Sequence, residues 1–93
     1  MTNEQNRTLS VDAAVIALAD KYSETWRDKD DAYWFYRVNQ EVGELGSVLA
    51  GDHDDAKEWE LMQIAAMCIN WLRMDAPFGF AFSDIENARE LLK

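Results

Sequence analysis

The segment Gln40-Glu41-Val42-Gly43-Glu44-Leu45 holds two glutamates, Glu41 and Glu44, three residues apart. Residues at this spacing share one face of an α-helix. At about 100° per residue, the same stripe carries mostly apolar side chains: Trp34, Val38, Leu45 and Val48. Both acids therefore fall on the face that should pack against another helix. A buried carboxylate is costly unless it is paired or binds a metal, so these positions indicate a site.

A second polar pair, Glu60 and Gln63, has the same spacing and shares a stripe with Ile64, Met67 and Trp71. The polar segment 51–55 between the two pairs is typical of a turn, and a short connection gives antiparallel neighbouring helices. At about 1.5 Å rise per residue, the two pairs lie at similar depth on either side of that turn. The sequence therefore predicts that three carboxylates and one amide converge between two helices.

Helical periodicity runs through most of the chain, and no strand pattern interrupts it. We expect one all-α domain over residues 1–93 with about four helices, an antiparallel central pair, and a flexible start over residues 1–8. Either Thr8 or Ser10 is a suitable N-cap for the first helix, whose apolar pattern continues to Trp26. The later helices are predicted over residues 31–50, 55–74 and 83–92.

Two further features concern packing around the central pair. The segment 64–72 is apolar nearly all round, which predicts burial on every side. A chain of 93 residues has few neighbours to supply that, so we expect a dimer or higher oligomer to complete the bundle. Pro77 and Gly79 predict a loop whose aromatics, Phe78 and Phe80, pack onto the bundle. Ser83-Asp84-Ile85-Glu86 has the pattern of a capping box at the last helix.

Composition excludes several classes of function. The formal net charge of −9 argues against non-specific nucleic-acid binding and disfavours an anionic membrane surface. An acidic protein that binds phosphate needs a cation between its own acidic groups and the phosphate. The single cysteine excludes an internal disulfide, and no apolar leader or membrane span is evident in the sequence. We therefore expect a soluble cytoplasmic protein with no membrane partner.

The converging side chains match the ligands that Mg²⁺ prefers, which are a few carboxylates together with waters and substrate phosphates. The metal ligands that this convergence predicts are Glu41, Glu44 and Glu60. A Glu-x-x-Glu pattern alone is common on solvated helices. Its position on an apolar stripe, opposite a second pair, distinguishes it from that ordinary case.

The sequence resembles the MazG-like branch of the all-α NTP pyrophosphatase superfamily over roughly residues 31–75. That family's motif is Glu-Glu-x-x-Glu, a variable gap, and Glu-x-x-Asp on two antiparallel helices. Here the corresponding segments are 40–44 and 60–63. The resemblance implies Mg²⁺-dependent hydrolysis of a nucleoside triphosphate to monophosphate and pyrophosphate, in a dimer or tetramer. It also implies that Glu41, Glu44, Glu60 and Gln63 are the metal ligands. By the same resemblance Glu41 and Glu44 are the catalytic residues, and a glutamate-held water is the nucleophile.

Two positions depart from this motif. Gln40 stands where the family has its first Glu, and Gln63 stands where it has the closing Asp. An amide can coordinate a cation through its carbonyl oxygen, but two negative charges are missing. We expect weaker Mg²⁺ binding and a site for one metal rather than more.

Candidate substrate-binding residues are Trp34, Arg37 and Asn70. Trp34, like Trp59 and Trp71, has a ring face on which a base can stack, although core or interface packing is the commoner role at helical spacing. Arg37 is a candidate for contacting phosphate, with a surface ion pair as the alternative. Asn70 is a candidate for bonding a base or ribose, with a satisfied interface amide as the alternative.

The sequence favours an enzyme that removes non-standard or surplus nucleoside triphosphates. The main alternative is a weakly active or inactive relative of the same fold that serves as an oligomeric interaction module. In that case the acids are satisfied across the oligomer interface. A third hypothesis, an acidic mimic of nucleic acid, rests on net charge alone.

Overall fold

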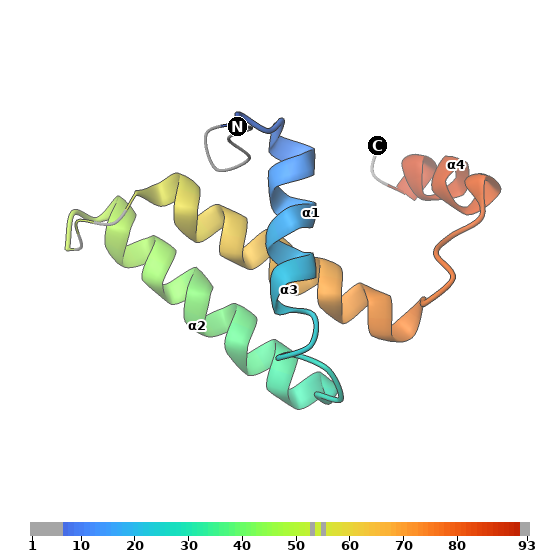
Figure 1. The fold of residues 1–93 in the computed structure, drawn as a ribbon, viewed down its shortest axis with the longest axis horizontal. Helices are drawn as coiled ribbons and strands as arrows, with labels where there is room; N and C mark the ends of the chain where they lie inside the picture. The colour runs from blue at the N-terminus through green and yellow to red at the C-terminus, as the bar shows by residue number, and fades with distance from the viewer. Residues whose placement is uncertain (1–6, 53, 55, 92–93) are drawn as a thin grey trace, which may run out of the picture.

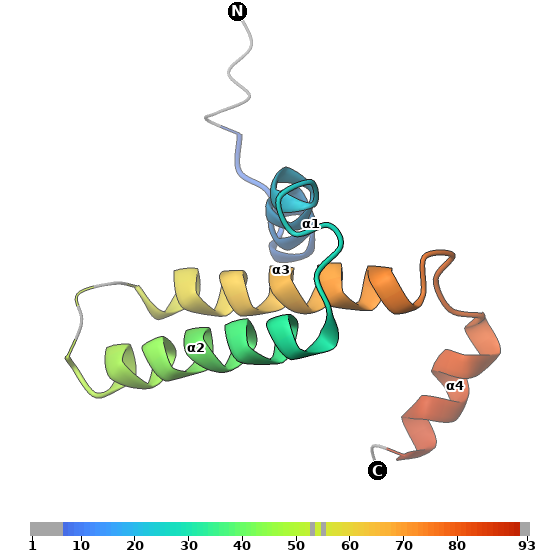
Figure 2. The ribbon, with the colours of Figure 1, turned by 90° about the horizontal axis from the view of Figure 1, so that it is seen from below.

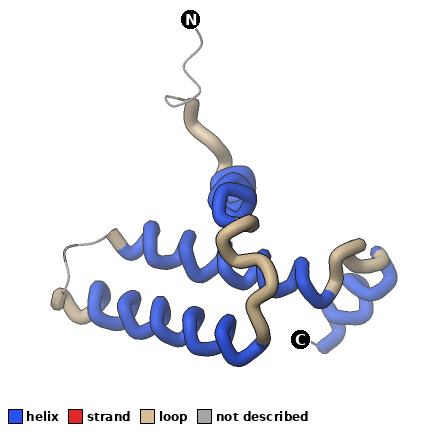
Figure 3. Tube along the Cα trace, turned by 60° about the horizontal axis from the view of Figure 1, so that its bottom comes forward, coloured by secondary structure: helices blue, strands red, loops and turns tan. Residues whose placement is uncertain are grey.

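A computed structural model describes residues 7–52, 54 and 56–91. Throughout these residues the regular structure is helical, and no strand is present (Figure 3). The helices are α1 (Val11–Tyr22), α2 (Asp31–Leu49), α3 (Lys57–Asp75) and α4 (Phe82–Leu91). The predictions of an all-α fold and of four helices are confirmed. The expected flexibility up to residue 6, a helix start at residue 55 and a helix end at residue 92 fall outside the described residues.

Short polar side chains fix the starts of the first two helices. Ser10 is the N-cap of α1, and its hydroxyl accepts a hydrogen bond from the backbone N–H of Ala13 at 3.2 Å. Asp30 caps α2 by accepting from the N–H of Tyr33 at 2.9 Å. These bonds satisfy backbone donors that a helix start otherwise leaves without a partner.

The first helix is shorter than its apolar pattern predicted. It ends at Tyr22, four residues before Trp26, and the chain turns through residues 23–28. Asp28 adopts a positive φ of 65°, a left-handed conformation that Asp tolerates better than most residues. The turn reverses the chain into α2, yet Tyr22 and Trp26 remain stacked, with ring centroids 5.3 Å apart.

The third helix lies in the middle of the fold. The antiparallel helices α2 and α3 run side by side, as predicted, and α1 crosses the opposite side of α3 (Figures 1 and 2). Within the described chain α1 and α2 do not pack against each other. Among the described residues, the packing contacts between helices therefore all involve α3.

The core is small and centres on one indole. Trp34 is 1% exposed, and its Nε1 donates to the sulfur of Met74 at 2.9 Å. Trp26 contacts the edge of Trp34, with centroids 5.6 Å apart. The other fully buried apolar side chains in the described part of the chain come from α1 and α3: Ala19, Ala66 and Met67.

The last helix differs from expectation. Within the described residues α4 packs against no other helix, and Figure 1 shows it standing away from the α2–α3 pair. Phe78 is fully exposed and Phe80 is 59% exposed, so the prediction that they pack onto the bundle is wrong. Gly79, at a φ of +82°, helps direct the connection away from the pair. The helix begins at Phe82, so Ser83 lies inside its first turn and is not the predicted cap.

Large apolar side chains remain exposed on α3 as well as on α4. Leu61 and Leu72 are about half exposed on α3, and Phe82 is mostly exposed on α4. The prediction that segment 64–72 is buried on every side is therefore not met within one chain. No helix in the described part of the protein is both long and apolar enough to cross a membrane.

We predict that Trp34→Ala lowers the free energy of unfolding by about 3–5 kcal/mol, because it empties the centre of the core. Phe35→Ala is the matched control, since Phe35 is the next residue of α2 and is 65% exposed. It should change stability by about 0.5 kcal/mol or less. Urea unfolding measures both, and equal losses would contradict this description of the core.

Candidate metal centre

Three carboxylates meet between the central helices. Glu41 and Glu44 come from α2, and Glu60 comes from α3. One oxygen from each lies within 4.8 Å of the other two. Glu41 is 4% exposed and Glu60 is 3% exposed, whereas Glu44 is exposed at the open side of the cluster. The convergence predicted from the helical spacing is present.

Glu60 has an unsatisfied atom. Its Oε2 is buried and has no hydrogen-bond partner within the described structure. Leaving a buried polar atom without a partner costs about 1–3 kcal/mol, and more for a charged group. Native structures keep few such atoms, and an ion or water is a common explanation. Glu60 Oε2 is therefore a buried acceptor that a further species, such as an ion or a water, could satisfy.

Glu41 lies in the middle of the cluster. Arg37 contacts it along α2, with Nη2 3.6 Å from Oε1. Despite that cation, the pKa of Glu41 is raised from its ordinary 4.5 to about 7. Burial is the largest cause, followed by hydrogen bonding to Glu44 and repulsion from its charge, and then by the same effects from Glu60. Burial and the two neighbouring carboxylates thus oppose ionisation of Glu41.

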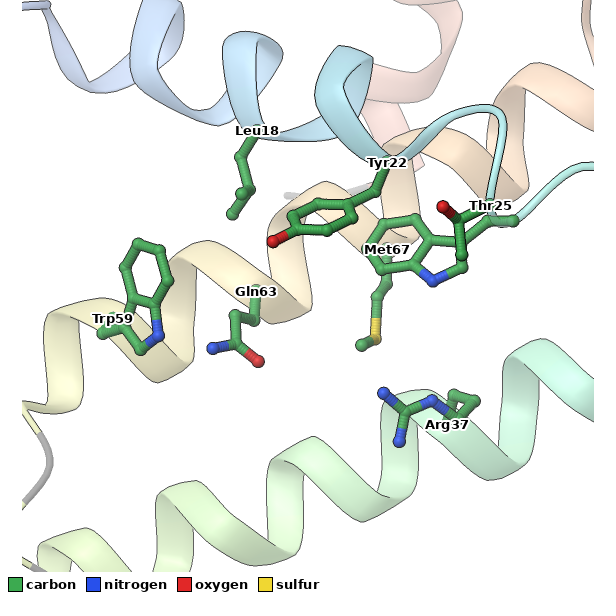
Figure 4. A pocket seen from close by; sticks show the side chains of 8 residues that line it. Leu18, Tyr22, Thr25, Arg37, Trp59, Gln63 and Met67 are labelled. Carbon is green, nitrogen blue, oxygen red and sulfur yellow. The ribbon is translucent and has the colours of Figure 1, made fainter. Parts of the chain in front are cut away.

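Gln63 lies one turn beyond Glu60 and bridges two groups. Its neighbours fix the orientation of the amide, with nitrogen and oxygen exchanged relative to Figure 4. The nitrogen then donates to Glu41 Oε2 at 3.1 Å, and the oxygen accepts from Trp59 Nε1 at 2.6 Å. Gln63 was expected to offer its oxygen to a metal. In this arrangement it offers its nitrogen to a carboxylate instead.

The predicted substrate-binding residues separate into two groups. Arg37 lies beside the acids and also donates to the side chain of Gln40. Trp34 is enclosed in the core, so its ring has no face open to a ligand in this chain. Asn70 is 6% exposed; its amide donates to the Ala19 carbonyl at 3.0 Å and accepts from Arg73 at 3.2 Å. Trp34 therefore packs in the core, which is the commoner role of an aromatic residue at helical spacing. Asn70 is an amide whose hydrogen bonds are satisfied within the protein.

A cavity of about 280 Å³ adjoins the acids, and sequence reasoning missed most of it. Trp59 and Gln63 contribute from α3, while Tyr22 and Trp26 contribute from α1 and the turn after it (Figure 4). The four-residue spacing of Tyr22 and Trp26 was the available signal. It indicated a helix face, but not that this face lies across α3 beside the carboxylates.

No protein-family model, curated protein or solved structure matches this chain. The donor set consists of carboxylate oxygens, which are hard ligands that suit Mg²⁺, Mn²⁺ or Ca²⁺. The unsatisfied Glu60 Oε2 and the crowding of negative charge both fit a divalent cation.

We predict that Mg²⁺ stabilises the protein and that Glu60→Gln removes this effect. A cation that binds only the folded state at 100 times its Kd adds about 2.7 kcal/mol of stability. Without metal, Glu60→Gln should be more stable than the wild type because it relieves repulsion from Glu41 and Glu44. Thermal unfolding with EDTA or with Mg²⁺ measures both effects.

The control is Glu58→Gln, which makes the same charge change at an exposed position of α3. It should keep the full response to Mg²⁺. If Mg²⁺ stabilises the Glu60 and Glu58 variants equally, the cation binds elsewhere and this description of the centre is wrong.

We also predict that the metal-free protein loses stability as pH rises. Since folding raises the pKa of Glu41 from 4.5 to about 7, the folded state holds a proton that the unfolded state releases. The associated stability is complete below pH 4.5 and is lost as pH rises through about 7. It amounts to about 3 kcal/mol at most.

Glu41→Gln isolates this contribution, because glutamine cannot ionise. The difference in unfolding free energy between wild type and Glu41→Gln, measured by urea in EDTA, should change by about 2–3 kcal/mol between pH 5 and pH 8. Other carboxylates contribute equally to both proteins. A constant difference across this range would show that Glu41 has an ordinary pKa.

Proposed function

We propose that this protein is a Mg²⁺-dependent hydrolase that converts nucleoside triphosphates to monophosphates and pyrophosphate, in the cytoplasm. The observation that carries the proposal is the convergence of the carboxylates of Glu41, Glu44 and Glu60, together with the unsatisfied Glu60 Oε2. The resemblance of segments 40–44 and 60–63 to the MazG-like motif supplies the reaction class. A net charge of −9 makes a cation the natural intermediary for a polyphosphate.

Each residue has a separate role in this proposal. Glu41, Glu44 and Glu60 hold Mg²⁺, which when bound neutralises phosphate charge and lowers the pKa of a water. Glu44, at the open side, is the residue best placed to orient an attacking water. Arg37, beside Glu41, carries a charge that attracts the substrate's phosphates. Gln63 orients the Glu41 carboxylate through its amide nitrogen.

We further propose that the active form is a homodimer or homotetramer. The support is the apolar surface on α3 and α4 that one chain leaves uncovered, including Leu61, Leu72 and Phe82. Burying apolar surface between copies stabilises association by about 25 cal/mol per Å² before the entropic cost of assembly.

A second candidate function has its own support. Gln40 and Gln63 remove two negative charges from the motif, and Gln63 presents its nitrogen to Glu41. Such a site would hold a cation weakly, which favours an oligomeric interaction module without activity. In that case Glu44→Ala would leave every property except local stability or assembly unchanged.

The experiment that separates these functions is pyrophosphate release from a panel of ribo- and deoxyribonucleoside triphosphates. We expect release with Mg²⁺, none with EDTA, and a loss of at least about 100-fold in Glu44→Ala, since the variant removes a water-orienting group. Glu58→Ala is the matched control and should retain activity.

Two results would contradict the enzyme hypothesis. One is the absence of release from every nucleotide tested, with a folded protein confirmed by circular dichroism. The other is Mg²⁺-dependent release that persists in Glu44→Ala, which would point to a contaminating hydrolase.

A further inference from the structure

The cavity beside the carboxylates has walls suited to a flat ring. Tyr22 and Trp26 form one wall, with their rings stacked at an interplanar angle of 27°. Trp59, which is 48% exposed, stands on the other side, across Gln63 in Figure 4. Aromatic side chains bind heteroaromatic rings by stacking, with about 1–3 kcal/mol per base.

The size and polarity of the cavity restrict its occupant. At about 280 Å³ it is near the lower limit of sites for small molecules, so it suits a base or nucleoside rather than an entire triphosphate. Thr25, Arg37 and Gln63 supply polar groups along the lining, and none of the described residues that line the cavity is acidic. The cavity thus differs chemically from the acidic cluster next to it.

Gln63 belongs to both sites. Its oxygen accepts from the indole N–H of Trp59 in the cavity wall, and its nitrogen donates to Glu41 in the cluster. If the Gln63 amide were rotated by 180°, its oxygen would face the Glu41 carboxylate and its nitrogen would face the Trp59 N–H. Both hydrogen bonds would then be lost. The position of the Trp59 indole therefore affects how the Glu41 carboxylate is held.

We infer that this cavity binds the heteroaromatic ring of a nucleoside and that Gln63 couples its occupancy to cation binding by the carboxylates. A ring stacked on Trp59 fixes the indole N–H against the Gln63 oxygen. The amide nitrogen then holds Glu41 toward Glu44 and Glu60. The identity of the ring rests on the proposed function, whereas the coupling does not require hydrolysis.

The test uses nucleosides without phosphate, so that no hydrolysis contributes. Adenosine, guanosine, cytidine, uridine and thymidine are titrated while ligand NMR reports binding. Calorimetry then measures the Kd of Mg²⁺ with and without the best nucleoside. We expect the nucleoside to tighten Mg²⁺ binding by about 5-fold or more, and Mg²⁺ to tighten nucleoside binding by the same factor.

Three variants separate the effect of stacking on Trp59 from the effect of the hydrogen bonds that Gln63 makes. Trp59→Leu removes the stacking surface, so nucleoside affinity should fall by about 5-fold or more. Trp59→Phe keeps a ring but lacks the N–H, so the nucleoside should still bind. The factor by which the nucleoside tightens Mg²⁺ binding should fall to about one. Gln63→Leu should behave in the same way. Trp71→Phe is the control, because its N–H bonds to Asp31 outside the cavity.

Failure to bind any nucleoside, or unchanged affinity in a folded Trp59→Leu, would overturn the cavity assignment. Undiminished coupling in Trp59→Phe and Gln63→Leu would overturn the role of Gln63. These outcomes are distinct from failure of the proposed function. If a nucleoside binds and tightens Mg²⁺ binding but no pyrophosphate is released, the cavity assignment is supported and the hydrolase is excluded. If pyrophosphate is released but no nucleoside binds, the hydrolase is supported and the cavity assignment is wrong.

Discussion

The burial of Glu41 and Glu60 between α2 and α3 is the constraint on which the site and its neighbours depend. A core of this size has little stability to spare, and two carboxylates at 4% and 3% exposure oppose folding unless their charge is compensated. The protein supplies Arg37 at 3.6 Å and the amide nitrogen of Gln63. Glu60 Oε2 still has no partner in the described structure. The proposed divalent cation would compensate the charge of these carboxylates and would supply a partner for Glu60 Oε2.

The position of α3 explains why one small chain can carry this arrangement. It contacts α2 on one side and α1 on the other, so a single helix presents Glu60 to the acids and Trp59 to the cavity. Gln63 lies one turn after Glu60 and contacts both Glu41 in the cluster and Trp59 in the cavity wall. The same central position leaves apolar residues such as Leu61 and Leu72 uncovered. These are the surfaces on which the proposed assembly relies.

Local patterns in the sequence were sufficient to predict the number and type of the elements and the carboxylate cluster, although not the end of α1 or the cap of α4. The spacing of Glu41 and Glu44 on an apolar stripe, with a short turn before Glu60, predicted the convergence because helix geometry and hairpin topology are both short-range consequences of sequence. Contacts between distant segments were not predictable in this way. The crossing of α1 over α3, which brings Tyr22 to the cavity, has no local signal. For the same reason Trp34 was proposed as a ligand-binding residue although it fills the core, and Phe78 was expected to pack although it is fully exposed.

Anomalous diffraction from crystals grown with Mn²⁺ would show whether the three carboxylates bind a cation. We expect an anomalous peak bounded by Glu41, Glu44 and Glu60, with Glu60 Oε2 among the ligands. The contradicting result is the absence of a peak at this position, with Glu60 Oε2 satisfied by an ordered water or by a group from a second copy of the chain. In that case the buried acids would be elements of assembly rather than of catalysis.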